Sequence, residues 1–400
     1  MLKPYFHLLP VQHNEYTTHL LLHLAKKHGI QLARTPEEAD CIWVSMCDIT
    51  EFGALLAAKK LGRPVVAGGF TARFGCVGAM ADAVCEGEAY EFMEAFAAAR
   101  DFDEVIQAGA YSQRIDYGDN PIVRVTPNAF YYYTGKGCPM RCKFCCLSHS
   151  RDYQFAPQSL IEKAIRALPP KGKLFPMCSY WPYRLAPALS KRLGALDVRV
   201  SDYVAGRVFA GRQIRTGIEF ASEALRKNLA KPLPLDTITA FFQRTKKEKK
   251  EAACYLIAGL ETEEAYDELL SCFPVDGSLS PRVHLILTNF DPQPFTPMHD
   301  FDIRRKVVVD GKALFAKAQR INRRVRVHPV KYMAHSTWRT IMQRAKTLEE
   351  VRFCWGQRNE RENDRMLRAV ESAFPALLGT ATLADVLARS RQSLPAYAPQ

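Results

Sequence analysis

The sequence predicts an α/β protein in which a small parallel sheet with helices on both faces precedes a larger partial barrel of strand and helix units. Three observations predict this class. Short apolar runs alternate with longer segments whose apolar residues recur at helical spacing. This alternation occurs in two blocks, separated by a polar stretch with Gly and Pro near residue 120. The chain has 400 residues, 48% of them hydrophobic and 24% charged, which suffices for two or three domains.

Residues 1–110 are expected to form a small doubly wound domain. The expected strands cover residues 41–45, 64–69 and 83–85, and the expected helices cover residues 16–27, 51–61 and 88–99. Strands alternating with helices favour a parallel sheet, because each helical crossover returns the chain to the same end of the sheet. Residues 101–128 are expected to be a linker, since they contain the turn-forming run at residues 117–121.

Residues 128–300 predict six βα units, which fit a partial (β/α)6 barrel of the TIM type. The expected strands cover residues 130–134, 173–177, 198–201, 214–220, 253–258 and 283–288, and the expected helices cover residues 157–168, 185–193, 223–229, 235–250 and 262–271. All strands of such a barrel point the same way, so their carboxyl ends meet at one rim. We expect the chemistry at that rim.

Residues 301–400 are expected to form a separate, basic and mainly helical domain. They carry 20 Lys and Arg against nine Asp and Glu, so +11 of the chain's formal net charge of +13 lies here. Short strands are expected at residues 306–309 and 325–327, and residues 347–350 are typical of a capping box. A basic surface attracts polyanions, nucleic acid above all; the alternative is a solvated helical surface that is rich in Arg.

Cations alternate with aromatic side chains in this basic region, a pattern that suits phosphate contact combined with base stacking. The residues concerned are Arg304, Arg305, Lys306, Arg320, Arg323, Arg324, Arg326, His328, Lys331, Tyr332, Trp338, Arg339, Arg344, Trp355 and Arg358. No role is assigned to His299, His328 or His335, because an isolated His is more often structural than catalytic.

The sequence shows no membrane or secretion signal. No run approaches the roughly 18 apolar residues of a transmembrane helix, and the first residues lack the apolar core of a signal peptide. We therefore expect a cytoplasmic protein without a membrane partner. In that compartment the 12 cysteines are expected to be metal ligands, catalytic groups or buried thiols rather than disulfides.

Three of the cysteines form a cluster directly after the first expected barrel strand. Cys138, Cys142 and Cys145 have the spacing Cys-x3-Cys-x2-Cys, in a loop with Gly on both sides of Lys136. Three thiolates this close can converge on one metal site, and thiolates select zinc or iron–sulfur clusters. A closed zinc site would need a fourth ligand, whereas a cluster held by three cysteines leaves one iron free. Structural zinc and chance clustering of buried thiols stay open as alternatives.

This motif, with Phe144 before the last cysteine, resembles that of the radical S-adenosylmethionine (SAM) superfamily. Three further segments are similar to the branch that methylthiotransferases share with cobalamin-dependent radical SAM enzymes: residues 217–233, which begin Gly-Ile-Glu, residues 255–264 and the Pro-rich residues 290–298. The resemblance covers residues 128–300, and residues 30–100 more loosely.

The resemblance implies a [4Fe-4S] cluster on Cys138, Cys142 and Cys145, with SAM on the open iron. Reduction by a flavodoxin- or ferredoxin-like protein would cleave SAM to a 5′-deoxyadenosyl radical, which takes hydrogen from the substrate. The residues implied for SAM binding are Phe144, Ser201, Glu219 and Ile257. Two positions depart from the family pattern: residues 175–180 lack the usual Gly-Gly-Glu type signature, and Tyr203 stands where Arg is common.

The resemblance gives the first domain three interpretations. As a Rossmann-like, cobalamin-binding-like domain it would hold a corrinoid, although it lacks the Asp-x-His-x-x-Gly motif. As in methylthiotransferases it would hold a second cluster, but no cysteine precedes Cys41 and Cys76 lies short of the third position. As a degenerate domain it would only support the barrel, with Cys41, Cys47, Cys76 and Cys85 as buried apolar groups.

We interpret the chain as a radical SAM enzyme whose favoured substrate is a nucleobase or base substituent in DNA or RNA, for example in the hypermodified thymidines of phage DNA. The alternatives are a cobalamin-dependent methylase or other radical enzyme acting on a peptide or small molecule, a methylthiotransferase-like enzyme, and a non-enzymatic basic nucleic-acid-binding zinc protein.

Overall fold

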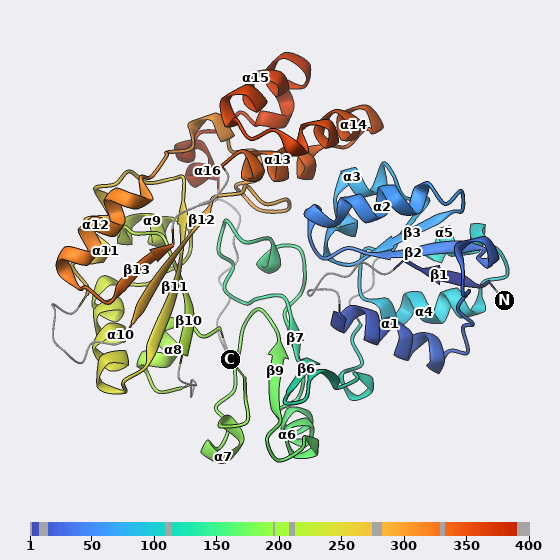
Figure 1. Cartoon of the computed structure of the whole chain (residues 1–400), viewed down its shortest axis with the longest axis horizontal. Coiled ribbons are helices and arrows are strands. Elements are labelled where there is room, and N and C mark those ends of the chain that lie inside the picture. The colour runs from blue at the N-terminus through green and yellow to red at the C-terminus, as the bar shows by residue number, and fades with distance from the viewer. Residues whose placement is uncertain are drawn as a thin grey trace. The chain divides into compact units, whose positions relative to one another are not determined.

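The computed structural model describes residues 2–7, 15–108, 114–194, 197–207, 213–273, 282–328 and 333–389. The chain forms two compact units, and Figure 1 draws the elements of both. The first unit contains residues 1–123 and 338–360, and the second contains residues 124–337 and 361–400. The division into domains at 1–110, 128–300 and 301–400 stays a prediction.

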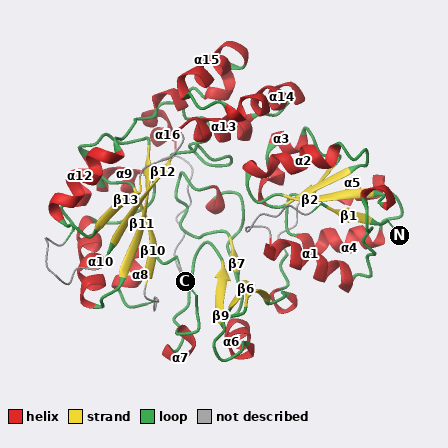
Figure 2. Cartoon of the chain, viewed as in Figure 1, coloured by secondary structure: helices red, strands yellow, loops and turns green. Residues whose placement is uncertain are grey.

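The first unit is built on a four-stranded parallel sheet in which neighbouring strands follow chain order. Its strands are β1 (Pro4–Phe6), β2 (Cys41–Ser45), β3 (Val65–Gly68) and β4 (Ala83–Val84). Its helices are α1 (Glu15–Lys27), α2 (Phe52–Lys59), α3 (Gly75–Gly78), α4 (Ala89–Ala98), α5 (Phe102–Ala108) and α14 (Leu348–Gly356). Figure 2 shows α2 and α3 on one side of this sheet and α1 and α4 on the other. The expected sheet with helices on both faces is confirmed.

The central strand β2 is buried along its whole length, as its unbroken apolar sequence predicts. Trp43 on this strand packs edge-on against Phe96 of α4 at 4.7 Å between ring centroids. The expected linker at residues 101–128 is wrong in part, because it contains α5 and the strand β5 (Val123–Thr126). In α5 the fully buried Val105 supplies the apolar contact that keeps this polar segment folded.

The second unit contains two sheets that parallel bridges connect. One sheet has the order β5, β6 (Ala129–Tyr133), β9 (Lys173–Met177), and the other has the order β10 (Gln213–Glu219), β11 (Glu251–Ala258), β12 (Val283–Asn289), β13 (Val325–His328). Leu193 bridges to Leu174 of β9, and Asp197 bridges to Arg215 of β10. The strand pairs β6–β9, β10–β11, β11–β12 and β12–β13 of these two sheets are all parallel, which is the order of a partly open barrel.

Two of the expected strands are wrong. Residues 198–201 do not form a strand; they lead into α8 (Val200–Val204), where Val200 and Tyr203 are buried at helical spacing. Residues 306–309 form no strand either, because this segment has no neighbouring strand and Val308 is 75% exposed. The strand expected at 325–327 is confirmed as β13, which pairs with β12 and so belongs to the barrel sheet.

The remaining helices of the second unit are α6 (Gln158–Ala167), α7 (Pro187–Ser190), α9 (Glu223–Asn228), α10 (Leu235–Lys247), α11 (Ala265–Leu270), α12 (Gly311–Ile321), α15 (Asn363–Ala373) and α16 (Leu383–Arg389). Helix α13 (Met333–Arg344) begins in this unit. Figure 1 shows α9 to α12 on one side of the sheet β10–β13. No helix among the described residues is long and apolar enough to cross a membrane.

The sheet β10–β13 has one apolar face and one mixed face. The residues that point toward the helices are buried: Ile214, Ile218, Ala252, Cys254, Leu256, Val283, Leu285, Leu287, Val325 and Val327. On the opposite, inner face the strands carry Arg215, Gly217, Tyr255, His284, Ile286, Arg326 and His328, all partly or fully exposed. The inner face is therefore the side of the sheet on which a ligand can bind.

Candidate metal and cofactor site

The three clustered cysteines lie in a loop that follows the short strand β7 (Gly135–Lys136), which pairs with β8 (Gln154–Phe155). The loop is held by its own polar groups. The His149 ring lies 3.0 Å from the Cys142 carbonyl oxygen, and the Ser148 hydroxyl donates to the Cys145 carbonyl at 2.9 Å. Arg141 has a φ of 51°, a conformation that non-Gly residues rarely adopt. These contacts fix the backbone of the loop that carries the three cysteines.

Cys138, Cys142 and Cys145 line one cavity of about 350 Å³ at the carboxyl ends of the barrel strands. Burial raises the pKa of all three thiols, that of Cys142 to about 12, while the nearby Lys231 lowers the pKa of Cys138 and Cys142. A metal would compensate for burial by binding the thiolates. Three thiols facing one cavity fit the donor set of an iron–sulfur cluster.

A single metal ion fits this arrangement less well. Thiolates that share one zinc lie about 4 Å apart, because each Zn–S bond is about 2.3 Å long. Within the described residues, no group of three or more His, Cys, Asp or Glu side chains is placed to hold one ion. Three thiols are one fewer than the four ligands of a closed structural zinc site, whereas a cluster held by three cysteines leaves one iron free.

Glu219 and Lys231 form an ion pair on the wall of the same cavity. Their Oε1 and Nζ atoms lie 3.0 Å apart, and both side chains are largely buried, at 18% and 23% exposure. Glu219 ends β10 with a φ of 74°, next to an irregularity in the pairing of β10 with β11. Burial alone would lower the pKa of Lys231, but Glu219 and Cys142 raise it, so Lys231 stays charged.

Two buried charged residues fix the segments that carry this pair. The Arg226 guanidinium is fully buried and donates to the carbonyl oxygens of Phe220, Ala221 and Leu233 at 2.7–2.8 Å. The Glu261 carboxylate accepts from the backbone N–H groups of Ala221 and Ser222 at 2.7 and 2.8 Å. These hydrogen bonds hold the backbone that follows Glu219 and the backbone near Lys231.

The predicted SAM-binding residues are partly brought together. Phe144, Ser201 and Glu219 line the cavity with the cysteines. Ile257 does not line it but packs against the core cluster under the cysteine loop; Tyr255, two residues earlier on the same face of β11, lines the cavity. The roles of these four residues stay predictions.

Sequence reasoning missed two cations of the cavity wall, Arg199 and Lys231. Arg199 precedes α8, where a strand was expected, and its guanidinium carbon lies 6.0 Å from the centre of the Tyr180 ring. Lys231 is part of the 217–233 segment, but only the fold shows that it faces Glu219. The available signal for Lys231 in the sequence was its position between an expected helix and Pro232.

The end of the described chain covers the cysteine loop. Cys142 and Phe144 share an apolar core with Ala381 and the fully buried Val386, and the partly buried Leu383 and Leu387 pack against it. Three of these four residues lie in α16, a helix in the region for which a basic domain was expected. Residues far from the motif in sequence thus shield it from solvent.

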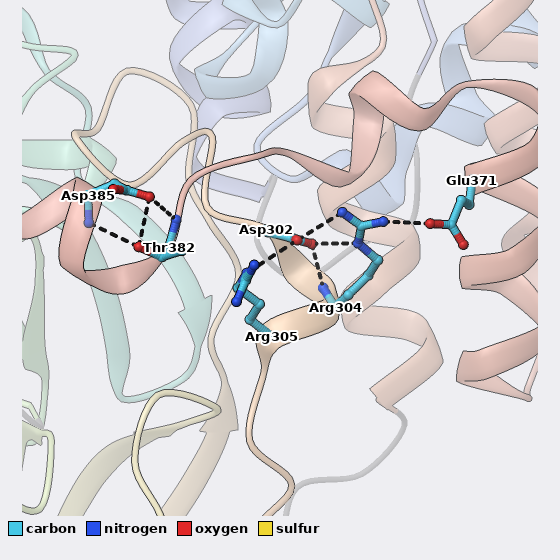
Figure 3. A network of polar contacts seen from close by, with 6 residues as sticks. All are labelled: Asp302, Arg304, Arg305, Glu371, Thr382 and Asp385. Atoms are coloured by element: carbon cyan, nitrogen blue, oxygen red, sulfur yellow. Dashed lines mark hydrogen bonds and ion pairs between the residues drawn. The ribbon is translucent and has the colours of Figure 1, made fainter.

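A polar network anchors this covering segment (Figure 3). The Asp302 carboxylate is 5% exposed and accepts two hydrogen bonds from the Arg304 guanidinium at 2.9 Å, while Arg304 also pairs with Glu371 of α15 at 2.6 Å. The Asp302 N–H donates to the Ala381 carbonyl at 2.9 Å, directly before α16. The Thr382 hydroxyl then caps α16 by accepting from the Asp385 N–H.

Several cations and aromatics of the basic region are used in packing within the first unit. Trp338 is 2% exposed and its indole N–H donates to the Cys354 carbonyl, so the expectation that it stacks on bases is wrong. Arg339 pairs with Asp48 at 2.9 Å, and Arg358 lies 4.5 Å from the centre of the Trp355 ring. The capping box at Thr347 and Glu350 is confirmed. Lys331 and Tyr332 lie outside the described residues.

The cysteines of the first unit are mostly buried. Cys41 and Cys76 are fully buried and Cys85 is 5% exposed, and burial raises the pKa of Cys41 and Cys76 to about 12. Cys47 is partly exposed. Burial of this kind is typical of thiols that act as small apolar side chains.

No protein-family model matches the chain. Over 139 residues the chain is 27% identical to the ribosomal protein uS12 methylthiotransferase RimO of Psychrobacter arcticus, and equally to that of Psychrobacter cryohalolentis. The match covers 31% of this chain and spans about a quarter, 26%, of the length of these relatives.

Two solved structures that resemble the chain are radical SAM proteins. One is the cobalamin-dependent SAM radical enzyme OxsB with aqua-cobalamin and SAM bound (12% identity, TM-score 0.47, 69% of this chain and 53% of that chain). The other is the radical SAM methyltransferase TsrM from Kitasatospora setae with cobalamin and a [4Fe-4S] cluster bound (12% identity, TM-score 0.48, 74% of this chain and 77% of that chain). Over 31% of its length, the chain is therefore similar in sequence to methylthiotransferases, one of the two kinds of enzyme that its motifs resemble.

Proposed function

We propose that the chain is a radical SAM enzyme that binds a [4Fe-4S] cluster through Cys138, Cys142 and Cys145 and binds SAM beside it. The observation that carries this proposal is that the three thiols of the motif open into the same cavity as Glu219 and Lys231. When bound and reduced, the cluster would supply the electron that cleaves SAM. We also propose a flavodoxin- or ferredoxin-like protein as the electron donor and the cytoplasm as the location.

The residues of the cavity have separate tasks in this proposal. Lys231 and Arg199 offer positive charge to the SAM carboxylate, and Glu219 offers a carboxylate to its ammonium group or ribose hydroxyls. Tyr255 supplies an aromatic side chain on the sheet side. Helix α16 and Phe144 keep water from the cysteine loop, which a reactive radical requires.

Anaerobic reconstitution with iron and sulfide tests the cluster. We expect about four irons per chain, a brown protein, and formation of 5′-deoxyadenosine from SAM after reduction. The variant Cys142→Ala should lose iron and activity, whereas Cys254→Ala, which removes a buried thiol on β11 outside the cavity, should keep both. A colourless protein that binds zinc would overturn the proposal, and about eight irons would favour a methylthiotransferase-like enzyme.

We propose a nucleobase or base substituent in DNA or RNA as the substrate. The excess charge of residues 301–400 supports this, since Arg320, Arg323 and Arg326 of the second unit stay exposed. If the protein binds nucleic acid, the logarithm of its affinity should fall linearly with the logarithm of salt concentration. Binding that is insensitive to salt would favour a peptide or small molecule instead. A corrinoid spectrum in the purified protein would indicate a cobalamin-dependent methylase.

A further inference from the structure

Two histidines, neither of them assigned a role from the sequence, form a pair on the inner face of the barrel sheet. His284 Nδ1 and His328 Nε2 lie 2.9 Å apart, and the two rings stack at 5.2 Å between centroids. At this distance one ring donates its N–H to the other, so the pair shares one proton when both rings are neutral. His284 lies on β12 and His328 at the end of β13.

The strand register places this pair on the same inner face of the sheet as Tyr255 of the proposed SAM cavity. Tyr255, which lines the cavity, is the direct neighbour of Ile286 on β12, and Ile286 is the direct neighbour of His328 on β13. Adjacent strands are about 4.8 Å apart, so His328 lies about 10 Å from Tyr255 along one row of the inner face. His284 occupies the next row, between Ala253 and Arg326.

The charges around the pair are mainly positive. The charged groups that act on the pKa of His284 are Glu251 at the start of β11, Arg282 before β12 and Arg326 on β13. Both arginines are exposed, and among the described residues neither forms an ion pair; Arg326 contacts only the backbone carbonyls of Arg323 and Val325. On the same face Arg215 is paired with Asp197 at 2.9 Å and contributes no net charge.

We propose that His284, His328 and Arg326 form a subsite for a phosphoryl group of the substrate, on the inner face of the sheet, about 10 Å from Tyr255 of the SAM cavity. A tetrahedral dianion can accept hydrogen bonds from both imidazoles and from the guanidinium, and each of these bonds is charge-assisted. The subsite rests on the proposed function, whose substrate it narrows to a phosphorylated molecule. That class includes nucleotides and nucleic acids as well as small phosphate esters.

Binding should be coupled to proton uptake. Burial lowers the pKa of His284, and His328, Arg282 and Arg326 lower it further against the opposite effect of Glu251. His284 is therefore largely neutral near pH 7, and a bound dianion favours its protonation. Affinity for a dianion should rise by about five- to tenfold from about pH 8 to about pH 6.

Sulfate is a suitable probe, because it is a tetrahedral dianion whose charge does not change in this pH range. We would titrate the full-length protein, labelled with 15N in its histidines, at constant ionic strength, and assign the two rings with His284→Asn and His328→Gln. Sulfate should shift the ring signals of His284 toward the protonated form and also perturb those of His328, with millimolar half-saturation. In Arg326→Gln the half-saturating concentration should rise at least about fivefold.

The matched control is Arg368→Gln. Arg368 is an exposed arginine of α15, outside the sheet β10–β13, so the control removes the same charge without altering the inner face. Sulfate binding should be unchanged in it. Equal weakening in both variants, or sulfate titrations that leave the two ring signals unmoved, would overturn the subsite.

Competition separates the sources of the phosphoryl group. Displacement of sulfate by a nucleoside monophosphate indicates a small phosphate ester. Displacement only by a short single-stranded oligonucleotide indicates a nucleic acid. Acetate should not displace sulfate. Displacement by acetate at equal concentration would contradict a phosphoryl subsite. The titration needs neither iron nor SAM cleavage, so failure of the subsite and failure of the radical SAM proposal are seen in different measurements.

Discussion

Glu219 and Lys231 face each other across the cavity wall at 3.0 Å, although one ends a strand and the other follows a helix. Each side chain neutralises the charge of the other, which would otherwise be largely buried without a partner. Glu219 maintains this contact with a left-handed backbone conformation, which non-Gly residues adopt at a cost of roughly 1–2 kcal/mol. A strained, charged pair at the carboxyl end of a barrel strand is typical of a binding site rather than of a structural ion pair.

Replacement of Lys231 by Met should lower the free energy of unfolding by about 1–3 kcal/mol, because Glu219 would keep a partly buried charge without its partner. Affinity for SAM should fall in the same variant. Urea unfolding and SAM titration measure the two effects. Lys227→Met is the control, since Lys227 is exposed on α9. Equal losses of unfolding free energy in the two variants would show that the ion pair does not contribute to stability.

Gly217→Ala should disturb the site more than the fold. A Cβ atom at this position would overlap the Glu219 carboxylate, which is the movable end of a side chain. Glu219 would swing away from Lys231, so SAM affinity should drop while the free energy of unfolding changes by less than about 1 kcal/mol. Gly78→Ala, where a Cβ meets no atom within 4 Å, is the control. Unchanged SAM affinity in Gly217→Ala would contradict a role for the Glu219 carboxylate.

Arg226 should tolerate neither Met nor Lys. Its guanidinium satisfies three carbonyl oxygens in a fully buried position, and an ammonium group cannot reach all three. We expect a loss of about 3–5 kcal/mol for Arg226→Met, measured by urea unfolding, because each carbonyl would be left without a partner. The exposed Arg166→Lys should change stability by less than about 0.5 kcal/mol. A stable Arg226→Lys protein would show that the guanidinium geometry is unnecessary.

Val386→Asp should expose the cysteine loop. Val386 is fully buried in the core that contains Cys142 and Phe144, and a carboxylate there would separate α16 from this core. Mass spectrometry of the metal-free protein after brief alkylation should show several-fold faster modification of Cys142 than in the wild type. Val308→Asp, at a site that is 75% exposed, should leave the rate unchanged. Equal rates in both variants would mean that α16 does not shield the loop.

Asp302→Asn should make stability less sensitive to acid. Burial would raise the pKa of Asp302, but its bonds to Arg304 lower it below the ordinary value. A carboxylate with a lowered pKa stabilises the folded state above its unfolded pKa, about 4, and this contribution disappears as pH falls through the folded value. The difference in unfolding free energy between wild type and variant, about 1–2 kcal/mol at pH 7, should shrink below about pH 4.

Glu371→Gln is the control for this network. Glu371 is the outer, 54% exposed partner of Arg304, so its loss should cost less than about 0.5 kcal/mol. A pH dependence as large in Glu371→Gln as in Asp302→Asn would assign the acid sensitivity to the surface pair instead.

Local patterns predicted most of the strands. β2 and β9 occupy the residues expected for them, because a short apolar run between turn-forming residues has few other solutions. The patterns gave wrong predictions where contacts between distant segments determine the local structure. Residues 198–201 look like a strand, yet Val200 and Tyr203 are buried as part of a helix, and β13 belongs to the barrel sheet although its sequence neighbours are basic. Propensity is a weak guide where the partner is distant in sequence.

The spacing of Cys138, Cys142 and Cys145 and the position of Glu219 at the end of a strand are local features of the chain and can be predicted from it. The residues that surround them depend on how distant segments pack. Lys231, the covering helix α16 and the pair His284 and His328 take their places through strand register and packing between segments up to about 240 residues apart. Such contacts depend on which faces can be buried together, a property that no single segment carries.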